Sequence, residues 1–166
     1  TQYRPGEDLL ACSPELDWKG SLSKKNLTAL LKVFQEEYDL VILDTPSGDN
    51  GLIGAALALS DIRLITLTPD APCLRGTGRF LEALPDRDKV TGLIINQQAP
   101  GAALQPDEIK AHLGQLLIGV FPIDQASVWA NVSYGEPSVL QKNSKMGRSI
   151  RQLANRLLKM IDQLEL

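Results

Sequence analysis

The chain has 166 residues, of which 43% are hydrophobic and 22% are charged. This length and balance are typical of one globular domain with its own core. The 17 basic and 20 acidic side chains give a net charge of −3, whereas dedicated nucleic-acid binders usually carry a basic excess. Two cysteines and one histidine without metal-ligand spacing argue against a zinc centre. Because the sequence has no apolar run long enough to span a membrane and no secretory signal, a cytoplasmic location is expected.

Short apolar runs alternate with amphipathic segments through the first half of the chain. Residues 1–6 are expected to form a loop. Strands are predicted at residues 9–12, 40–43 and 62–67, and helices at residues 27–38, 52–59 and 74–84. Pro85 is expected to end the third of these helices.

The same alternation continues through the second half. Strands are predicted at residues 91–95 and 116–121. A helix between them is expected to start at Pro106 and to be capped by Gly114, since proline favours the first helical position and glycine the C-terminal cap. A last helix is predicted at residues 149–164, with apolar residues on one face.

These strands are apolar throughout, without the polar alternation of a half-exposed sheet. This pattern is typical of strands that are buried on both faces, and helix-length segments separate them. The sequence therefore predicts an α/β fold, with a parallel sheet covered by helices on both faces, as a single domain over residues 1–166. In such sheets ligands bind beyond the carboxyl ends of the strands. The candidate site residues thus lie at positions 44–48, 68–70, 96 and 122–124.

The segment from Tyr38 to Gly48 carries the strongest chemical signal. Asp44 follows an apolar run, where a carboxylate is costly unless something compensates its charge. A magnesium ion held through water would do so. Gly48 follows a proline and a serine, and a backbone N–H at a glycine can approach a γ-phosphate closely. The alternative is ordinary turn chemistry after a strand.

Several segments together resemble the MinD/ParA ATPases, over residues 7–164. They occur in the order of that family, at residues 38–48, 60–70, 93–96, 119–124 and 128–131 with 135–137. The last helix fits the same order. Among members of the family, the pilus-assembly CpaE/TadZ proteins and the FlhG regulators of flagellar number look most similar. The resemblance implies a P-loop NTPase fold.

The resemblance also implies roles for particular residues. Residues 38–48 correspond to the Walker B and switch segment, so Asp44 would hold Mg²⁺ through water and Gly48 would lie near the phosphates. Asn96 would meet the adenine base, and Pro122 and Asp124 would close over it. No catalytic residue is assigned. The cofactors would be Mg²⁺ and ATP, and the complete domain would be an ATP hydrolase.

The partners implied are a second copy of the chain, which would share the sandwiched ATP, and a protein partner. Function would be that of a dimerising positioning factor. Peripheral membrane attachment or DNA binding are alternatives that the overall charge does not support.

One family motif does not occur in this sequence. No Gly-x-x-x-x-Gly-Lys-[Ser/Thr] phosphate loop is present, although the family carries one on its first strand. The chain is therefore expected to be either a fragment or a degenerate relative, and by itself to neither bind ATP tightly nor hydrolyse it. Two alternatives remain open: an inactive interaction module of the same fold, and another α/β domain such as a relative of the synthetase-type amidotransferases or a flavodoxin-like binder.

Other aromatic and basic residues are given structural roles. Trp18, Phe121, Trp129 and Tyr134 are expected to pack in the core or against loops, because no basic stripe lies between them. His112 is expected to face solvent. The basic residues of the last helix are expected to form its solvated face: Arg148, Arg151, Arg156 and Lys159. Strand edges left without a first strand would favour self-association.

Overall fold

The structure, a computed structural model, describes residues 2–4, 6–10, 23–47, 51–84, 86 and 89–163. The chain divides into two compact units, Thr1–Leu59 and Ser60–Leu166. Each unit is described by itself.

The first unit begins with a small antiparallel pair of strands. Strand β1 (Gln2–Arg4) pairs with β2 (Glu7–Asp8), and Gly6 lies between them with a φ of 83°. This left-handed conformation favours glycine because other side chains clash there. The prediction of a loop over residues 1–6 was therefore wrong, since a tight turn lets two very short segments pair.

Two helices form the core of the first unit. Helix α1 (Lys24–Glu37) starts at Ser23, whose hydroxyl accepts a hydrogen bond from the Asn26 N–H at 3.2 Å. Such a cap satisfies an N–H that the helix itself cannot. Helix α2 (Gly51–Leu59) is short and apolar. The two helices bury a cluster against each other, made up of Leu27, Leu31, Ala55 and Ala56.

The predicted strand at residues 40–43 is not formed. Residues 40–46 have no regular secondary structure, and Leu40 and Ile42 are exposed, Ile42 to 83%. A strand requires hydrogen bonds from a neighbouring strand, and no described residue pairs with this segment. The predicted strand at residues 9–12 is also absent at residues 9 and 10, and its other half lies outside the described residues.

A three-stranded parallel sheet forms the centre of the second unit, which confirms the predicted fold class. Its strands are β3 (Ile62–Leu67), β4 (Val90–Gln98) and β5 (Leu116–Pro122), in the order β3–β4–β5. Helices α3 (Ala71–Ala83) and α4 (Pro106–Leu113) connect them. As predicted, α4 starts at Pro106 and is capped by Gly114 in the left-handed conformation.

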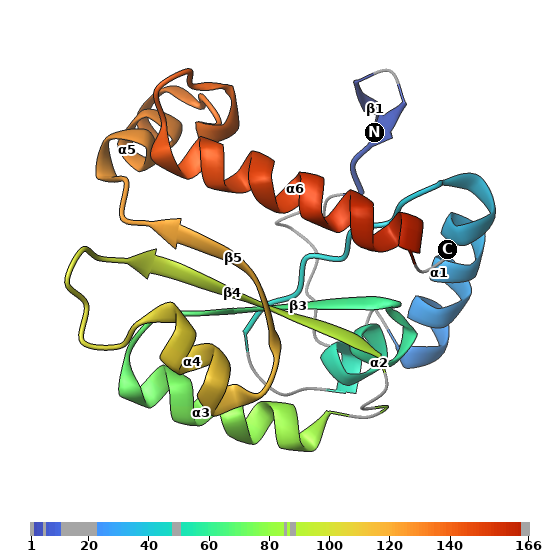
Figure 1. The fold of residues 1–166 in the computed structure, drawn as a ribbon. Coiled ribbons are helices and arrows are strands. Elements are labelled where there is room, and N and C mark those ends of the chain that lie inside the picture. Colours follow the sequence, from blue (N-terminus) through green and yellow to red (C-terminus); the bar gives the residue numbers. More distant parts are fainter. Residues whose placement is uncertain are drawn as a thin grey trace. The chain divides into compact units, whose positions relative to one another are not determined.

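Helices cover both faces of this sheet (Figure 1). Helices α3 and α4 lie on one face, and the long α6 (Lys145–Gln163) lies on the other, packed against β5. Between β5 and α6 the chain forms α5 (Gln125–Tyr134) and a 3-10 turn, η1 (Ser138–Leu140). The buried cluster beneath α3 and α4 is made up of Leu67, Leu93, Ile95 and Ile109.

A close backbone approach joins α6 to η1. A Cβ atom placed on Gly147 would lie 2.2 Å from the carbonyl oxygen of Ser138. Because both partners in this contact would be fixed by the backbone, no side-chain rotation could relieve the clash. Only a glycine at this position allows α6 to begin where it does.

Gly147→Ala is therefore expected to lower the free energy of unfolding by about 1–3 kcal/mol through overpacking. Gly76→Ala is the matched control, because Gly76 lies within α3 and a Cβ atom added there would meet no other atom within 4 Å. That change should raise the free energy of unfolding by about 0.5–1 kcal/mol. Urea denaturation of both variants checks this. Equal shifts in the two midpoints would contradict the argument.

Candidate functional site at the carboxyl ends of the strands

The carboxyl ends of β3, β4 and β5 meet at one edge of the sheet, because the three strands are parallel. Leu67 at the end of β3 is level with Ile95 of β4, and Pro122 at the end of β5 is level with Gln98. The residues just beyond these positions are therefore neighbours along one edge. This arrangement brings together the predicted site positions 68–70, 96 and 122–124.

An irregularity in β4 shapes this edge around Asn96. The register with β5 shifts between Ile95 and Gln98, and Gln97 has a φ of 59°, which is unusual for a residue other than glycine. The Asn96 side-chain oxygen accepts a hydrogen bond from the Gln97 N–H at 2.9 Å. Asn96 is half-buried, and this bond fixes its orientation while its amide nitrogen can still donate to a ligand.

Gln98 is a further polar residue near the end of β4, and the sequence reasoning did not single it out. Its carbonyl oxygen accepts a bond from the Ile123 N–H at 3.3 Å, and its side-chain nitrogen donates to the Leu104 carbonyl at 3.4 Å. Its buried side-chain oxygen accepts no hydrogen bond from the described residues. A buried acceptor without a donor is costly, but this atom has almost no accessible surface, so a ligand would reach it only if the side chain moved. No local sequence signal distinguishes Gln98 from Gln97.

Asp124, which was predicted to contact the nucleotide, holds two helices in place. One carboxylate oxygen accepts a bond from the Ser127 N–H at 3.3 Å. The other accepts bonds from the hydroxyls of Ser127, at 2.8 Å, and Ser144, at 3.1 Å, and from the Met146 N–H at 3.0 Å. The carboxylate thus caps α5 and also accepts hydrogen bonds from the residues at the start of α6. A role at the nucleotide stays a prediction.

These bonds also change the acidity of Asp124. The Met146 N–H, then the Ser127 hydroxyl, and further bonds from Ser127 and Ser144 lower the pKa of the Asp124 carboxyl from 3.8 to about 2. Hydrogen bonds to a carboxylate favour its charged form. The same effect, from the Thr68 hydroxyl and then the Cys73 N–H, lowers the pKa of Asp70, which caps α3.

The remaining predicted residues belong to the first unit or to strand ends. Asp44 is exposed, as are the following residues 45–47, and Gly48 lies outside the described residues. Pro122 is half-buried at the end of β5. Within the described ranges, no three histidine, cysteine, aspartate or glutamate side chains gather as a metal site. A water-mediated magnesium site at Asp44 would need only one carboxylate.

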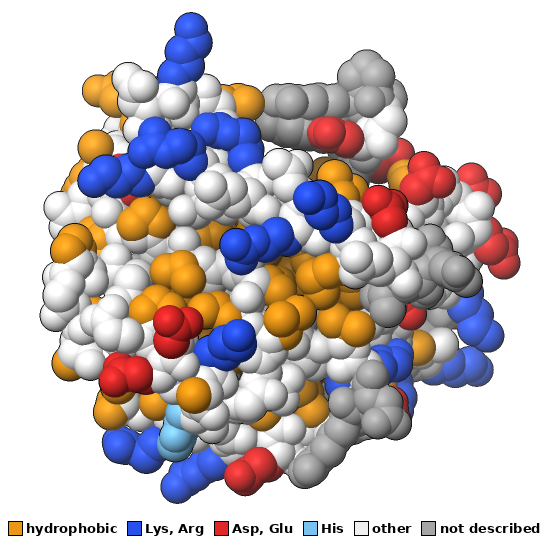
Figure 2. Space-filling model, viewed as in Figure 1, with side chains coloured by type: hydrophobic (Ala, Val, Ile, Leu, Met, Phe, Trp, Pro, Cys, Tyr) orange, Lys and Arg blue, Asp and Glu red, His pale blue; other side chains and the backbone are white. Residues whose placement is uncertain are grey.

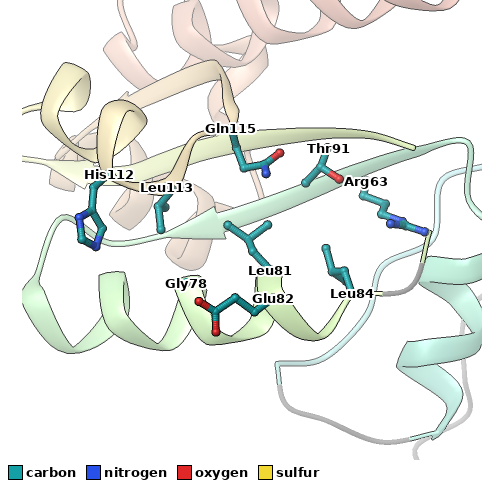
Figure 3. A pocket seen from close by; sticks show the side chains of 9 residues that line it. All are labelled: Arg63, Gly78, Leu81, Glu82, Leu84, Thr91, His112, Leu113 and Gln115. Atoms are coloured by element: carbon teal, nitrogen blue, oxygen red, sulfur yellow. The ribbon is translucent and has the colours of Figure 1, made fainter. Parts of the chain in front are cut away.

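A cavity of about 420 Å³ lies at the opposite, amino-terminal end of the strands (Figure 3). Its lining includes Arg63 near the start of β3, Thr91 near the start of β4, and His112 of α4. The Arg63 guanidinium is buried and donates to the Asp86 carbonyl at 3.1 Å. Because ligands of parallel sheets bind at the carboxyl ends, this cavity is separate from the candidate site.

Predictions for the aromatic and basic residues have mixed outcomes. The packing roles predicted for Trp129 and Tyr134 are wrong, because the two side chains are 67% and 85% exposed. Phe121 is half-buried, and Trp18 lies outside the described residues. As expected, His112 is exposed, and so are the basic residues of α6, namely Arg148, Arg151, Arg156 and Lys159. None of the described helices has the length and apolar character needed to cross a membrane.

The chain is similar in sequence to septum site-determining proteins. It is 27% identical over 147 residues to MinD of Thermotoga maritima, covering 84% of this chain and 54% of that protein. It is 24% identical over 161 residues to MinD of Bacillus subtilis, covering 92% and 60%. The chain thus spans little more than half the length of these relatives. No protein-family model matches it.

Solved structures share the fold. The MinC:MinD cell division protein complex of Aquifex aeolicus matches with a TM-score of 0.76 at 24% identity, over 84% of this chain and 60% of that one. MinD of Pyrococcus horikoshii, complexed with Mg-ADP, matches with a TM-score of 0.75 at 21% identity, over 87% and 61%. The architecture is therefore that of the MinD/ParA P-loop NTPases.

Asp124→Asn tests the role of the carboxylate in the fold. We expect it to lower the free energy of unfolding at pH 7 by about 2 kcal/mol, since it weakens the caps of two helices. Because the folded pKa lies below the unfolded value, the Asp124 contribution is complete above about pH 4 and is lost as the pH falls toward 2. Urea denaturation should therefore show the wild type and the variant converging in acid. A difference that is constant from pH 7 to pH 2.5 would contradict this.

Proposed function

We propose that this chain, a relative of the MinD/ParA proteins, provides the Walker B and adenine-side portion of a MinD/ParA-type ATPase that acts as a dimerising positioning factor. The observation that carries the proposal is the parallel sheet β3–β4–β5, whose fold matches MinD and whose strand ends gather Asn96 and Pro122 at one edge. Since the chain spans little more than half of its relatives, the activity belongs to the whole protein.

The residues present are compatible with a magnesium nucleotide. Asp44 is exposed, so its carboxylate can reach the water shell of Mg²⁺. Asn96 is half-buried and has an amide nitrogen to donate to the edge of a base such as adenine. When bound, Mg²⁺ would neutralise charge on the phosphates. The P. horikoshii relative was solved with Mg-ADP.

A second function is supported by Asp124. Both of its oxygens are engaged by the chain's own donors, so it contributes to the fold without a ligand. Together with the lack of a phosphate-loop motif in this sequence, it is compatible with a module that keeps the sheet for protein contacts and does not hydrolyse ATP. Under either function the location is cytoplasmic, with peripheral membrane attachment as the alternative. The A. aeolicus relative forms a complex with MinC, which makes a protein partner the natural expectation.

The 166-residue chain by itself is expected to show no micromolar affinity for Mg·ATP in a calorimetric titration, because its sequence supplies no phosphate loop. On the longest natural form of the protein, Mg·ATP should raise the melting temperature if the ATPase proposal holds. Asn96→Ala in that form should reduce the shift, with Asn155→Ala on the exposed side of α6 as the control. Micromolar binding by the short chain, or no shift in the long form, would count against the proposal.

Self-association of the 166-residue chain is also expected. Strand β3 is an outermost strand of the sheet, and none of the described residues forms a strand beside it on the side away from β4. Unpaired backbone N–H and C=O groups of an edge strand tend to pair with another chain. Light scattering should therefore give a mass that rises with concentration. A constant monomer mass up to millimolar concentration would contradict this expectation.

A further inference from the structure

Helix α5 reverses the usual distribution of polar and apolar residues. Its buried residue is Ser127, whereas Val128, Trp129 and Val132 are 47%, 67% and 73% exposed. Val132 lies four residues after Val128 and three after Trp129, and residues at these spacings are neighbours on a helix surface, so the three side chains form a continuous apolar strip. The helix contains no charged residue. Exposed apolar patches of this kind mark interaction sites more often than scattered single residues do.

Helix α5, which carries this strip, is attached to the neighbouring elements by several hydrogen bonds. Asp124 caps α5 and receives α6, as described above. The Ser138 hydroxyl of η1 and the Gln141 side-chain amide both donate to the Ser127 carbonyl, at 3.5 and 3.4 Å. Gly147 allows α6 to approach the Ser138 backbone closely. Because hydrogen bonds hold the side of α5 that carries Ser127 against η1, the opposite, apolar side of the helix faces solvent.

Basic side chains surround this part of the molecule. Between Ile123 and Arg151 the exposed charged residues are Lys142, Lys145, Arg148 and Arg151, against Glu136. With the half-buried Asp124 carboxylate included, four positive and two negative charges give a local sum of +2, whereas the whole chain carries −3. Figure 2 shows lysine and arginine side chains gathered over the start of α6, near α5, with hydrophobic side chains beside them.

We propose that the apolar strip of α5, with the basic start of α6, docks an acidic amphipathic helix of a partner protein. The strip lies on a helix of 10 residues, about 15 Å long, which matches the contact length of one packed helix. A partner would place apolar residues at three- and four-residue spacing on the strip and acidic residues opposite Lys145 and Arg148. Trp129 would be the central anchor, since tryptophan is enriched at interface hot spots.

Charge and apolar area distinguish this partner from two others. A second copy of the chain would bring two surfaces of local charge +2 together, which opposes symmetric docking. An anionic membrane would attract the same basic residues, so the apolar area of the strip decides between the two. Stable membrane binding usually takes more apolar area than one short strip. The inference does not depend on nucleotide binding.

A synthetic helical peptide tests the proposal on the full chain. The probe is a fluorescein-labelled 14-residue peptide with leucine along one face and glutamate on its flanks, and the control peptide replaces each glutamate with lysine. The chain carries Trp18→Phe so that Trp129 is its single tryptophan. We expect the acidic peptide to bind with a Kd of about 10–100 μM, to shift Trp129 emission to the blue, and to bind more weakly in salt.

Trp129→Ser, Val132→Ser and the pair Lys145→Glu with Arg148→Glu should each weaken peptide binding at least about tenfold. The matched controls are Leu158→Ser, a residue 55% exposed on α6, and Lys159→Glu; neither should change the Kd more than about twofold. Circular dichroism confirms that each variant folds.

Three results would overturn the proposal. One is equal binding of the acidic and lysine peptides, or no binding of either. Another is a blue shift of Trp129 with vesicles of phosphatidylserine and phosphatidylcholine that exceeds the shift with peptide, which would assign the strip to a membrane. The third is a concentration-dependent dimer that Trp129→Ser abolishes, which would assign the strip to a second copy.

Discussion

The carboxylate of Asp124 is the interaction on which the carboxyl-end half of the second unit depends. It receives donors from Ser127, Ser144 and Met146, so one side chain joins the end of β5 to two helices. Hydrogen bonds to an ionised acceptor are about twice as strong as neutral ones. The same carboxylate also helps to determine where α6, which covers one face of the sheet, begins.

This use of Asp124 has consequences for the candidate site. A carboxylate that accepts hydrogen bonds at both oxygens adds rigidity to the loop after β5. At the same end of the strands, the Gln97 N–H orients the Asn96 side chain, and the buried Gln98 oxygen accepts no hydrogen bond from the described residues. A site built on rigid elements binds with less loss of conformational entropy, which would favour the nucleotide proposed above.

The sequence predicted the features that local chemistry decides. The sequence predicted the apolar runs of β3, β4 and β5, and the proline and glycine at the two ends of α4. These features could be predicted because the spacing of apolar residues, helix capping and the backbone conformations of proline and glycine depend on only a few neighbouring residues. The Asp124 network was not readable, since Ser144 and Met146 lie about 20 residues further along the chain. The orphaned oxygen of Gln98 likewise depends on what surrounds it in space.

Two errors concern exposed apolar residues, and they have different physical causes. Ile42 is exposed because an apolar run forms a strand only when a neighbouring strand supplies hydrogen bonds. The hydrophobicity of a segment predicts that it is buried, but it does not identify the element that buries it. Trp129 is exposed although its helix is formed and anchored, because polar contacts occupy the inner side of α5. The first exposure reflects missing pairing in an irregular segment. The second is built into a defined surface, and it is therefore the stronger reason to look for a partner.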